Sequence, residues 1–182
     1  GNHRAHFYTN INYLRSNDVF KIGEAKHNGT NGLNIRGNVD LTLNDFITAY
    51  VNAKVSFYSR RSANGSYYWS AASTLRPNRI SPLIPLSYID AHAASAWDLV
   101  ANSNNIVDGK YFLAGTQSDM TNVFGDYYAS GYSKSTDRSF QFDAGVNIGL
   151  DKVLKGLSFH TRFSVDYSTA YITSYNNSYA TY

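Results

Sequence analysis

An uninterrupted alternation of apolar and polar residues, LNIRGNVDLTLN from Leu33 to Asn44, restricts the fold of this chain more than any other stretch. Leucine, isoleucine, valine and glycine occupy the odd positions, and asparagine, arginine, aspartate and threonine the even ones. A period of two indicates a β-strand with two different faces. In a soluble sandwich the apolar face packs on a core, whereas in a membrane barrel it faces lipid and the polar face lines the lumen. The fold therefore depends on which face meets water.

Four further segments share this period, so we expect an all-β chain with strands near residues 5–14, 33–44, 46–60, 139–150 and 157–171. These segments exceed the roughly 5 to 6 residues of an average globular strand. They reach the about 9 to 11 residues that a membrane strand needs, while no apolar run is long enough for a transmembrane helix. Their length favours strands that cross a bilayer.

The connections between these segments alternate in length. Residues 44–46 join the second segment to the third, and residues 151–156 join the fourth to the fifth, whereas a large loop over 61–132 follows the third. Short periplasmic turns and large extracellular loops are typical of outer-membrane barrels, which are even-numbered and start at about 8 strands. Because open edges in lipid leave backbone groups unpaired, five strands predict one arc of a large antiparallel transmembrane β-barrel.

Parity predicts the pairing in both hairpins, because residues paired across two strands share a face. The two segments that flank the loop 44–46 both have their apolar residues at odd positions, so the loop must contain an odd number of residues, as it does. The loop 151–156 has the even number required if Leu150 opposes Leu157. In that register Asp143 lies diagonal to Arg162 on the polar face, within reach of long side chains.

Composition excludes several classes of function. The net charge of +3 comes from 16 basic and 13 acidic residues that are well mixed along the chain, so no basic stripe suggests nucleic acid. The absence of cysteine excludes a disulfide framework, a thiolate metal site and a cysteine nucleophile. The chain opens with GNHRAHFYTNINYL, which reads as a strand and not as a signal peptide, so we expect it to belong to something larger.

Several long stretches resemble the barrel part of the SusC/RagA-like TonB-dependent transporters of Bacteroidota outer membranes. They are STLRPNRISPLIPLSYID at 73–90, DGKYFLAGTQSDMTNVFGDYYASGY at 108–132, VLKGLSFHTRFSVDY at 153–167 and NNSYATY at 176–182. The resemblance covers essentially the whole chain. It implies a nutrient importer in the bacterial outer membrane, which takes up oligosaccharides or peptides together with a SusD-like surface lipoprotein and with energy from TonB.

The resemblance is to a barrel segment only. Nothing in the sequence matches a TonB box, a plug domain or a terminal barrel strand. Contact with TonB is therefore expected through a plug region outside the given sequence, and the periplasmic coupling residues cannot be assigned. The substrate class, glycan or peptide, stays open.

The charged residues expected to face the lumen come from four of the five segments. They are Arg36, Asp40, Lys54, Asp143, Arg162 and Asp166. Two interpretations remain open: these residues contact substrate or plug, or they balance one another's charge across strands.

Aromatic residues of the large loop are candidates for contact with substrate or with the SusD-like partner. They are Tyr67, Tyr68, Trp69 and Trp97. The alternative is that they pack the loop on itself, since a loop of this length needs a small core of its own.

We expect no catalytic site, no metal site and no cofactor. His27, His92 and His160 match no recognised ligand spacing, and no G-x-S-x-G occurs. The protein is thus predicted not to be an enzyme. Two alternatives to the importer remain: a soluble or secreted all-β carbohydrate-binding module, and a passive porin or adhesin barrel.

Overall fold

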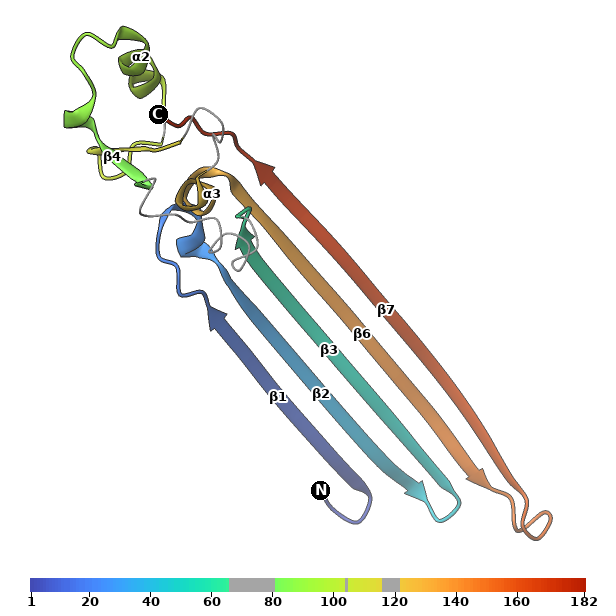
Figure 1. Ribbon diagram of the computed structural model, residues 1–182. Coiled ribbons are helices and arrows are strands. Elements are labelled where there is room, and N and C mark those ends of the chain that lie inside the picture. Colours follow the sequence, from blue (N-terminus) through green and yellow to red (C-terminus); the bar gives the residue numbers. More distant parts are fainter. Residues whose placement is uncertain (66–80, 104, 116–121) are drawn as a thin grey trace. The chain divides into compact units, whose positions relative to one another are not determined.

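Five long strands form the main sheet of the computed structural model, which describes residues 1–65, 81–103, 105–115 and 122–182. The strands lie side by side in the order β1-β2-β3-β6-β7 (Figure 1). Their bounds are β1 Ala5–Asn17, β2 Gly29–Asn44, β3 Ile47–Ala63, β6 Gly131–Gly149 and β7 Ser158–Asn176. The chain is mostly antiparallel β-sheet, so the expected all-β class is confirmed.

The strands are longer than the alternation alone predicts. Alternation places the start of β6 near residue 139, whereas the strand begins at Gly131, and β7 continues to Asn176. The extra residues break the strict alternation, for example at Ser133 to Ser135, but they still belong to the ladder. Backbone pairing, and not side-chain pattern, decides where these strands end.

The predicted register of the β6–β7 hairpin agrees with the backbone hydrogen bonds, which also give the β3–β6 register. The amide of Leu150 donates to the carbonyl of Leu157 at 2.9 Å, as parity required. Across β3 and β6, the amide of Gly149 donates to the carbonyl of Phe46 at 2.7 Å. At the tight β2–β3 turn, the Asn44 side-chain oxygen accepts from the amides of Phe46 and Ile47. This Asx-type bonding explains why so short a loop suffices.

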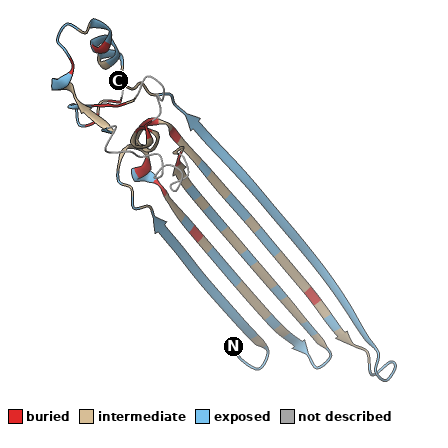
Figure 2. Cartoon of the chain, viewed as in Figure 1, coloured by how far each residue is buried: buried red, intermediate tan, exposed pale blue. Residues whose placement is uncertain are grey.

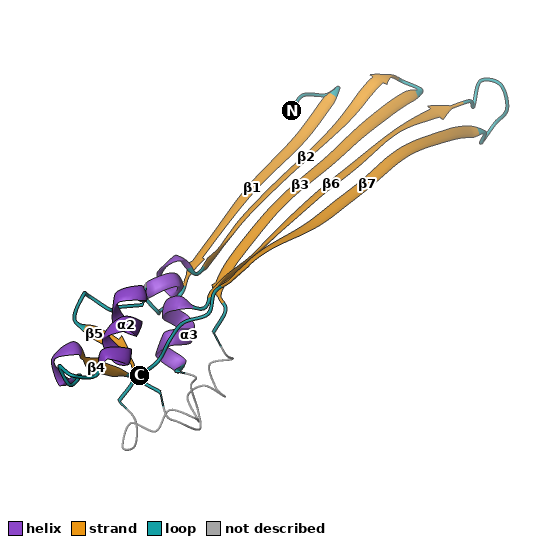
Figure 3. Cartoon of the chain, turned by 90° about the horizontal axis from the view of Figure 1, so that it is seen from above, coloured by secondary structure: helices purple, strands orange, loops and turns teal. Residues whose placement is uncertain are grey.

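The two long connections contain small elements that periodicity did not predict (Figure 3). These are η1 Gly23–His27, β4 Leu83–Pro85, η2 Leu86–Tyr88, α2 Ala94–Asn102, β5 Tyr111–Leu113 and α3 Val123–Ala129. Strands β4 and β5 pair antiparallel, with Ile84 level with Phe112. No helix in the described ranges is both long and apolar enough to span a bilayer.

The chain divides into two compact units. The sheet unit comprises residues 1–16, 30–60 and 135–172, and the connection unit comprises residues 17–29, 61–134 and 173–182. Few residues of the long strands are buried (Figure 2). The buried hydrophobic residues of the described chain all belong to the connection unit: Ala25, Ala63, Ile89, Ala96, Val107, Phe112, Leu113, Ala114 and Ala129. The connections therefore have a core of their own, whereas the described sheet unit buries no hydrophobic side chain.

Candidate functional site

The polar face of the sheet unit is hollowed into an open groove of about 460 Å³. Its polar lining comes from β2, β3, β6 and β7: Arg36, Asn38, Asn52, Lys54, Gln141, Asp143, Arg162, Ser164 and Asp166. Five of the six charged candidates named from the sequence are in this set. The sixth, Asp40, lines a neighbouring hollow together with Arg36 and with His6 of β1. Folding thus brings all six onto one face.

One charged pair in the groove is balanced. The Arg162 Nε donates to Asp143 Oδ1 at 2.7 Å, and the Asn52 side-chain amide lies 3.5 Å from Asp143 Oδ2. The predicted diagonal proximity of Asp143 and Arg162 is confirmed. Because the Asp143 side chain is only partly exposed, this row of contacts across three strands helps to hold their register.

The remaining cations of the groove have no such partner. The Arg36 Nε donates to the neutral oxygen of Asn38 at 3.2 Å. Within the described residues, neither Arg36 nor Lys54 makes an ion pair, and Asp166 makes none either. Mutual charge balance therefore accounts for Asp143 and Arg162, and Asp166 adds a weaker electrostatic attraction to Arg162. Arg36 and Lys54 have no ion-pair partner among the described residues.

The neutral members of the groove were not among the residues predicted from the sequence. Asn38, Asn52, Gln141 and Ser164 lie at the same parity as the charged candidates on their strands. The alternation could have identified them, because every second residue shares a face. A second row of polar contacts on this face was also not among the predicted site residues: the Asn147 side chain contacts both Thr48 and His160.

Of the aromatic candidates, Tyr67, Tyr68 and Trp69 lie outside the described residues. Trp97 lies in α2, is 37% exposed and donates from Nε1 to the carbonyl of Asp90 at 3.0 Å. The backbone amide and the imidazole of His92 both hydrogen-bond to the Asp90 carboxylate, and these bonds lower the pKa of Asp90. Asp90 thus organises the turn before α2, and Trp97 packs on that turn with part of its ring open to solvent.

Asn122 is the central polar residue of the connection unit. Its side-chain amide donates to the carbonyls of Pro82 and Ala114, both at 2.7 Å, and its oxygen accepts from the amide of Gly125 in α3. The hydroxyl of Tyr179 accepts from the Asn122 backbone amide at 3.0 Å. One buried asparagine therefore joins the residue before β4, the residue after β5, the helix α3 and the segment after β7.

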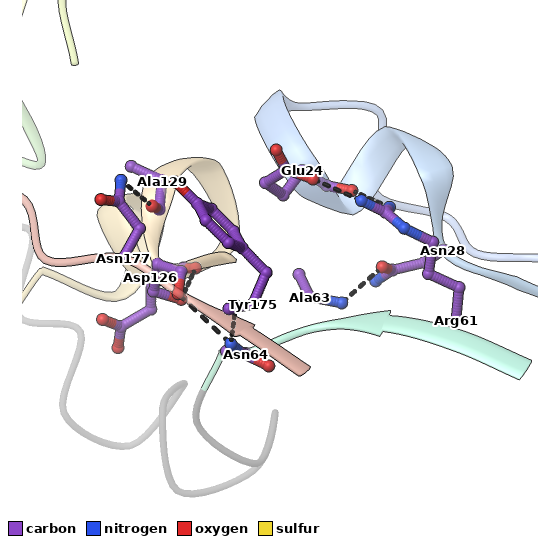
Figure 4. Close-up of polar contacts among 10 residues, drawn as sticks. Glu24, Asn28, Arg61, Ala63, Asn64, Asp126, Ala129, Tyr175 and Asn177 are labelled. Carbon is purple, nitrogen blue, oxygen red and sulfur yellow. Dashed lines mark hydrogen bonds and ion pairs between the residues drawn. The ribbon is translucent and has the colours of Figure 1, made fainter. Parts of the chain in front are cut away.

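A second set of polar contacts joins the ends of the two connections (Figure 4). Arg61 reaches both the carbonyl and the carboxylate of Glu24, with its guanidinium 4.0 Å from the centroid of the Tyr132 ring. The Asn28 side chain accepts from the amide of Ala63, and the Asn64 amide group reaches the carbonyl of Tyr175. The connection unit is thus one folded body held by contacts between distant segments.

No group of three or more histidine, aspartate or glutamate residues suited to a metal ion occurs in the described ranges. Comparison with family models, with curated proteins and with solved structures finds no match to this chain. The site must therefore be interpreted from its own chemistry: a polar, mixed-charge groove on one face of a sheet whose other face is apolar.

Proposed function

We propose that this chain is one arc of the β-barrel of an outer-membrane TonB-dependent importer of the SusC/RagA-like kind, with no bond-making chemistry of its own. In this proposal the apolar face of the sheet meets lipid and the groove on the polar face lines the lumen. Transport then consists of selective passage past the polar face.

The observation that carries the proposal is the exposed apolar face. Large hydrophobic side chains of the apolar face are exposed on all five strands, including Phe7, Ile11, Leu43, Phe57, Phe140, Phe159 and Phe163. Nothing in the sheet unit itself covers them. A continuous apolar face of this size is unstable in water, and strands of 13 to 19 residues have the reach to cross a bilayer.

The edges of the sheet support the same proposal. Strands β1 and β7 are the two outer strands, and β7 is exposed along its full length. An uncovered strand edge pairs readily with a further strand. In a barrel, additional strands of the protein would continue the sheet from both edges, which is why we propose an arc.

The import of oligosaccharides or peptides, the SusD-like lipoprotein and the coupling to TonB rest on the resemblance of the sequence stretches at 73–90, 108–132 and 153–167. In the proposed arrangement the connection unit is extracellular, where a folded body with an exposed Trp97 edge is available to a surface partner or a substrate.

Two substitutions on adjacent residues of β7 test the lipid-facing assignment. Phe163 is on the apolar face and is 64% exposed, whereas Ser164 lines the groove. In the full-length protein, Phe163→Arg should cost about 2–4 kcal/mol of folding stability if the residue lies near the bilayer midplane, whereas Ser164→Arg should be tolerated. The readout is the amount of folded protein in outer-membrane fractions and the unfolding free energy in lipid vesicles.

A water-soluble binding module gives the opposite result. An arginine in place of an exposed phenylalanine would then leave stability unchanged or improve solubility. Equal behaviour of the two variants in a protein that stays soluble without detergent would reject the membrane proposal.

A further inference from the structure

The unexplained charges of the groove form one row across four strands. The Phe46–Gly149 hydrogen bond places Lys54 level with Gln141, and the Leu150–Leu157 bond places Gln141 level with Asp166. The loop 44–46 leaves Leu43 opposite Ile47, and Gly32 lies against the ring of Tyr58. Both are consistent with Arg36 of β2 level with Lys54 of β3. All four residues of the row, Arg36, Lys54, Gln141 and Asp166, line the same groove.

This row is polarised. The cations Arg36 and Lys54 lie next to each other on β2 and β3, and the carboxylate of Asp166 lies on β7. Neutral Gln141 of β6 lies between Lys54 and Asp166. Adjacent strands are about 4.8 Å apart, so the outer members of the row are roughly 14 Å apart at their backbones. Asp166 is therefore too distant to neutralise Arg36.

Like charges on neighbouring strands are unfavourable unless an anion lies between them. The closest acid on the β6 side of Lys54 is Asp143, which is already engaged by Arg162 at 2.7 Å. On the other side, Asp40 lies four residues along β2 from Arg36 and makes no ion pair in the described chain. Within the described residues the cation pair thus faces the groove, and no described acid neutralises it.

We propose that Arg36 and Lys54 bind the carboxylate of a small solute that enters this groove. An arginine fork and a lysine ammonium together satisfy the oxygens of one carboxylate. Asp166 repels negative charge at the far end, so the row favours a solute whose negative group lies at the β2–β3 end. The inference rests on the proposed function in taking the ligand to be an imported solute.

The test uses a thiol placed in the row. The given sequence has no cysteine, and Gln141 is exposed, with no hydrogen bond or ion pair of its side chain to another described residue. In the full-length protein, the introduced thiol of the Gln141→Cys variant is alkylated with iodoacetate and, separately, with iodoacetamide. These reagents differ in carrying a carboxylate or a neutral amide. Their rate ratio therefore reports the attraction of a carboxylate, because a change in the pKa of the thiol affects both rates equally.

At low ionic strength, we expect either substitution, Arg36→Gln or Lys54→Gln, to lower the ratio of the iodoacetate rate to the iodoacetamide rate roughly three-fold. The double variant should lower this ratio further. The matched control is Lys155→Gln, which removes the same charge from the exposed β6–β7 turn and should leave the ratio unchanged. Sodium propionate at sub-molar concentration should slow the reaction with neutral iodoacetamide more than sodium chloride at the same concentration does, whereas propionamide should not slow it. Ser164→Cys provides a second position in the groove if Gln141→Cys does not fold.

An unchanged ratio in the Arg36→Gln, Lys54→Gln double variant would overturn the inference, as would an absence of protection by propionate. A thiol that reacts with neither reagent at either position would also overturn it, because another segment of the protein would then fill the groove. The readout does not depend on transport. If the protein is water-soluble and the rate ratio falls in the Arg36→Gln and Lys54→Gln variants, only the proposed function is rejected. If the protein resides in the outer membrane and these variants leave the rate ratio unchanged, only the carboxylate site is rejected.

Discussion

At the scale of single residues, the connection unit depends on Asn122. The residue is only 6% exposed, and its side chain makes three hydrogen bonds to backbone groups of three different segments. Replacing it with alanine leaves the carbonyls of Pro82 and Ala114 without these donors in a buried place, which typically costs about 1–3 kcal/mol for each group that stays unpaired. We expect Asn122→Ala to open the connection unit while the sheet unit stays folded.

Hydrogen exchange at residues 81–115 measures this opening. The control is Asn102→Ala, because the exposed Asn102 side chain donates only to the carbonyl of Asp98 within α2. Faster exchange in Asn122→Ala and unchanged exchange in Asn102→Ala is the expected pattern. Equal exchange in both variants would contradict the central place assigned to Asn122.

At the scale of elements, the β6–β7 hairpin is held by its backbone ladder and by the cross-strand pair of Asp143 and Arg162. The pair is partly exposed, so its loss through Asp143→Ala should lower stability by about 0.5–1 kcal/mol. We expect the change to affect stability more than uptake, since Asp143 is engaged with Arg162 and Asn52 and not with the open part of the groove. Unfolding free energy and uptake by cells are measured together, with Asp137→Ala on the same strand as the control. A large loss of uptake at normal protein level would show that Asp143 contacts the substrate.

At the scale of the whole molecule, the described sheet has an apolar face without a core and two outer strands without partners. Under the proposed function, both features lead us to expect a protein that is larger than the given sequence and that resides in lipid. The native protein, extracted from outer membranes in detergent, should have an intact mass above the 20.3 kDa of this chain, with peptides flanking Gly1 and Tyr182. A surface lipoprotein should co-purify with it. A species of about this mass that is soluble without detergent would favour the carbohydrate-binding module.

The five long strands, their two faces and the pairing parity of the two hairpins could be predicted from the sequence, whereas the full lengths of β6 and β7 could not. Alternation is a local property of each segment, and parity across a short loop leaves few ways to pair two strands, so Leu150 could be placed opposite Leu157 and Asp143 near Arg162. The six charged candidates could likewise be assigned to one face.

The fold of the connections and the charges that remain open could be established from the three-dimensional contacts alone. The contacts of Asn122 with Pro82, Ala114 and Tyr179 join segments far apart in the chain, and no local period encodes such contacts. The same applies to the groove, where parity placed Arg36 and Lys54 on one face but could not show that neither of them makes an ion pair with another described residue. Side-chain pattern specifies a face, whereas the geometry of neighbouring strands specifies which groups on that face are within reach of each other.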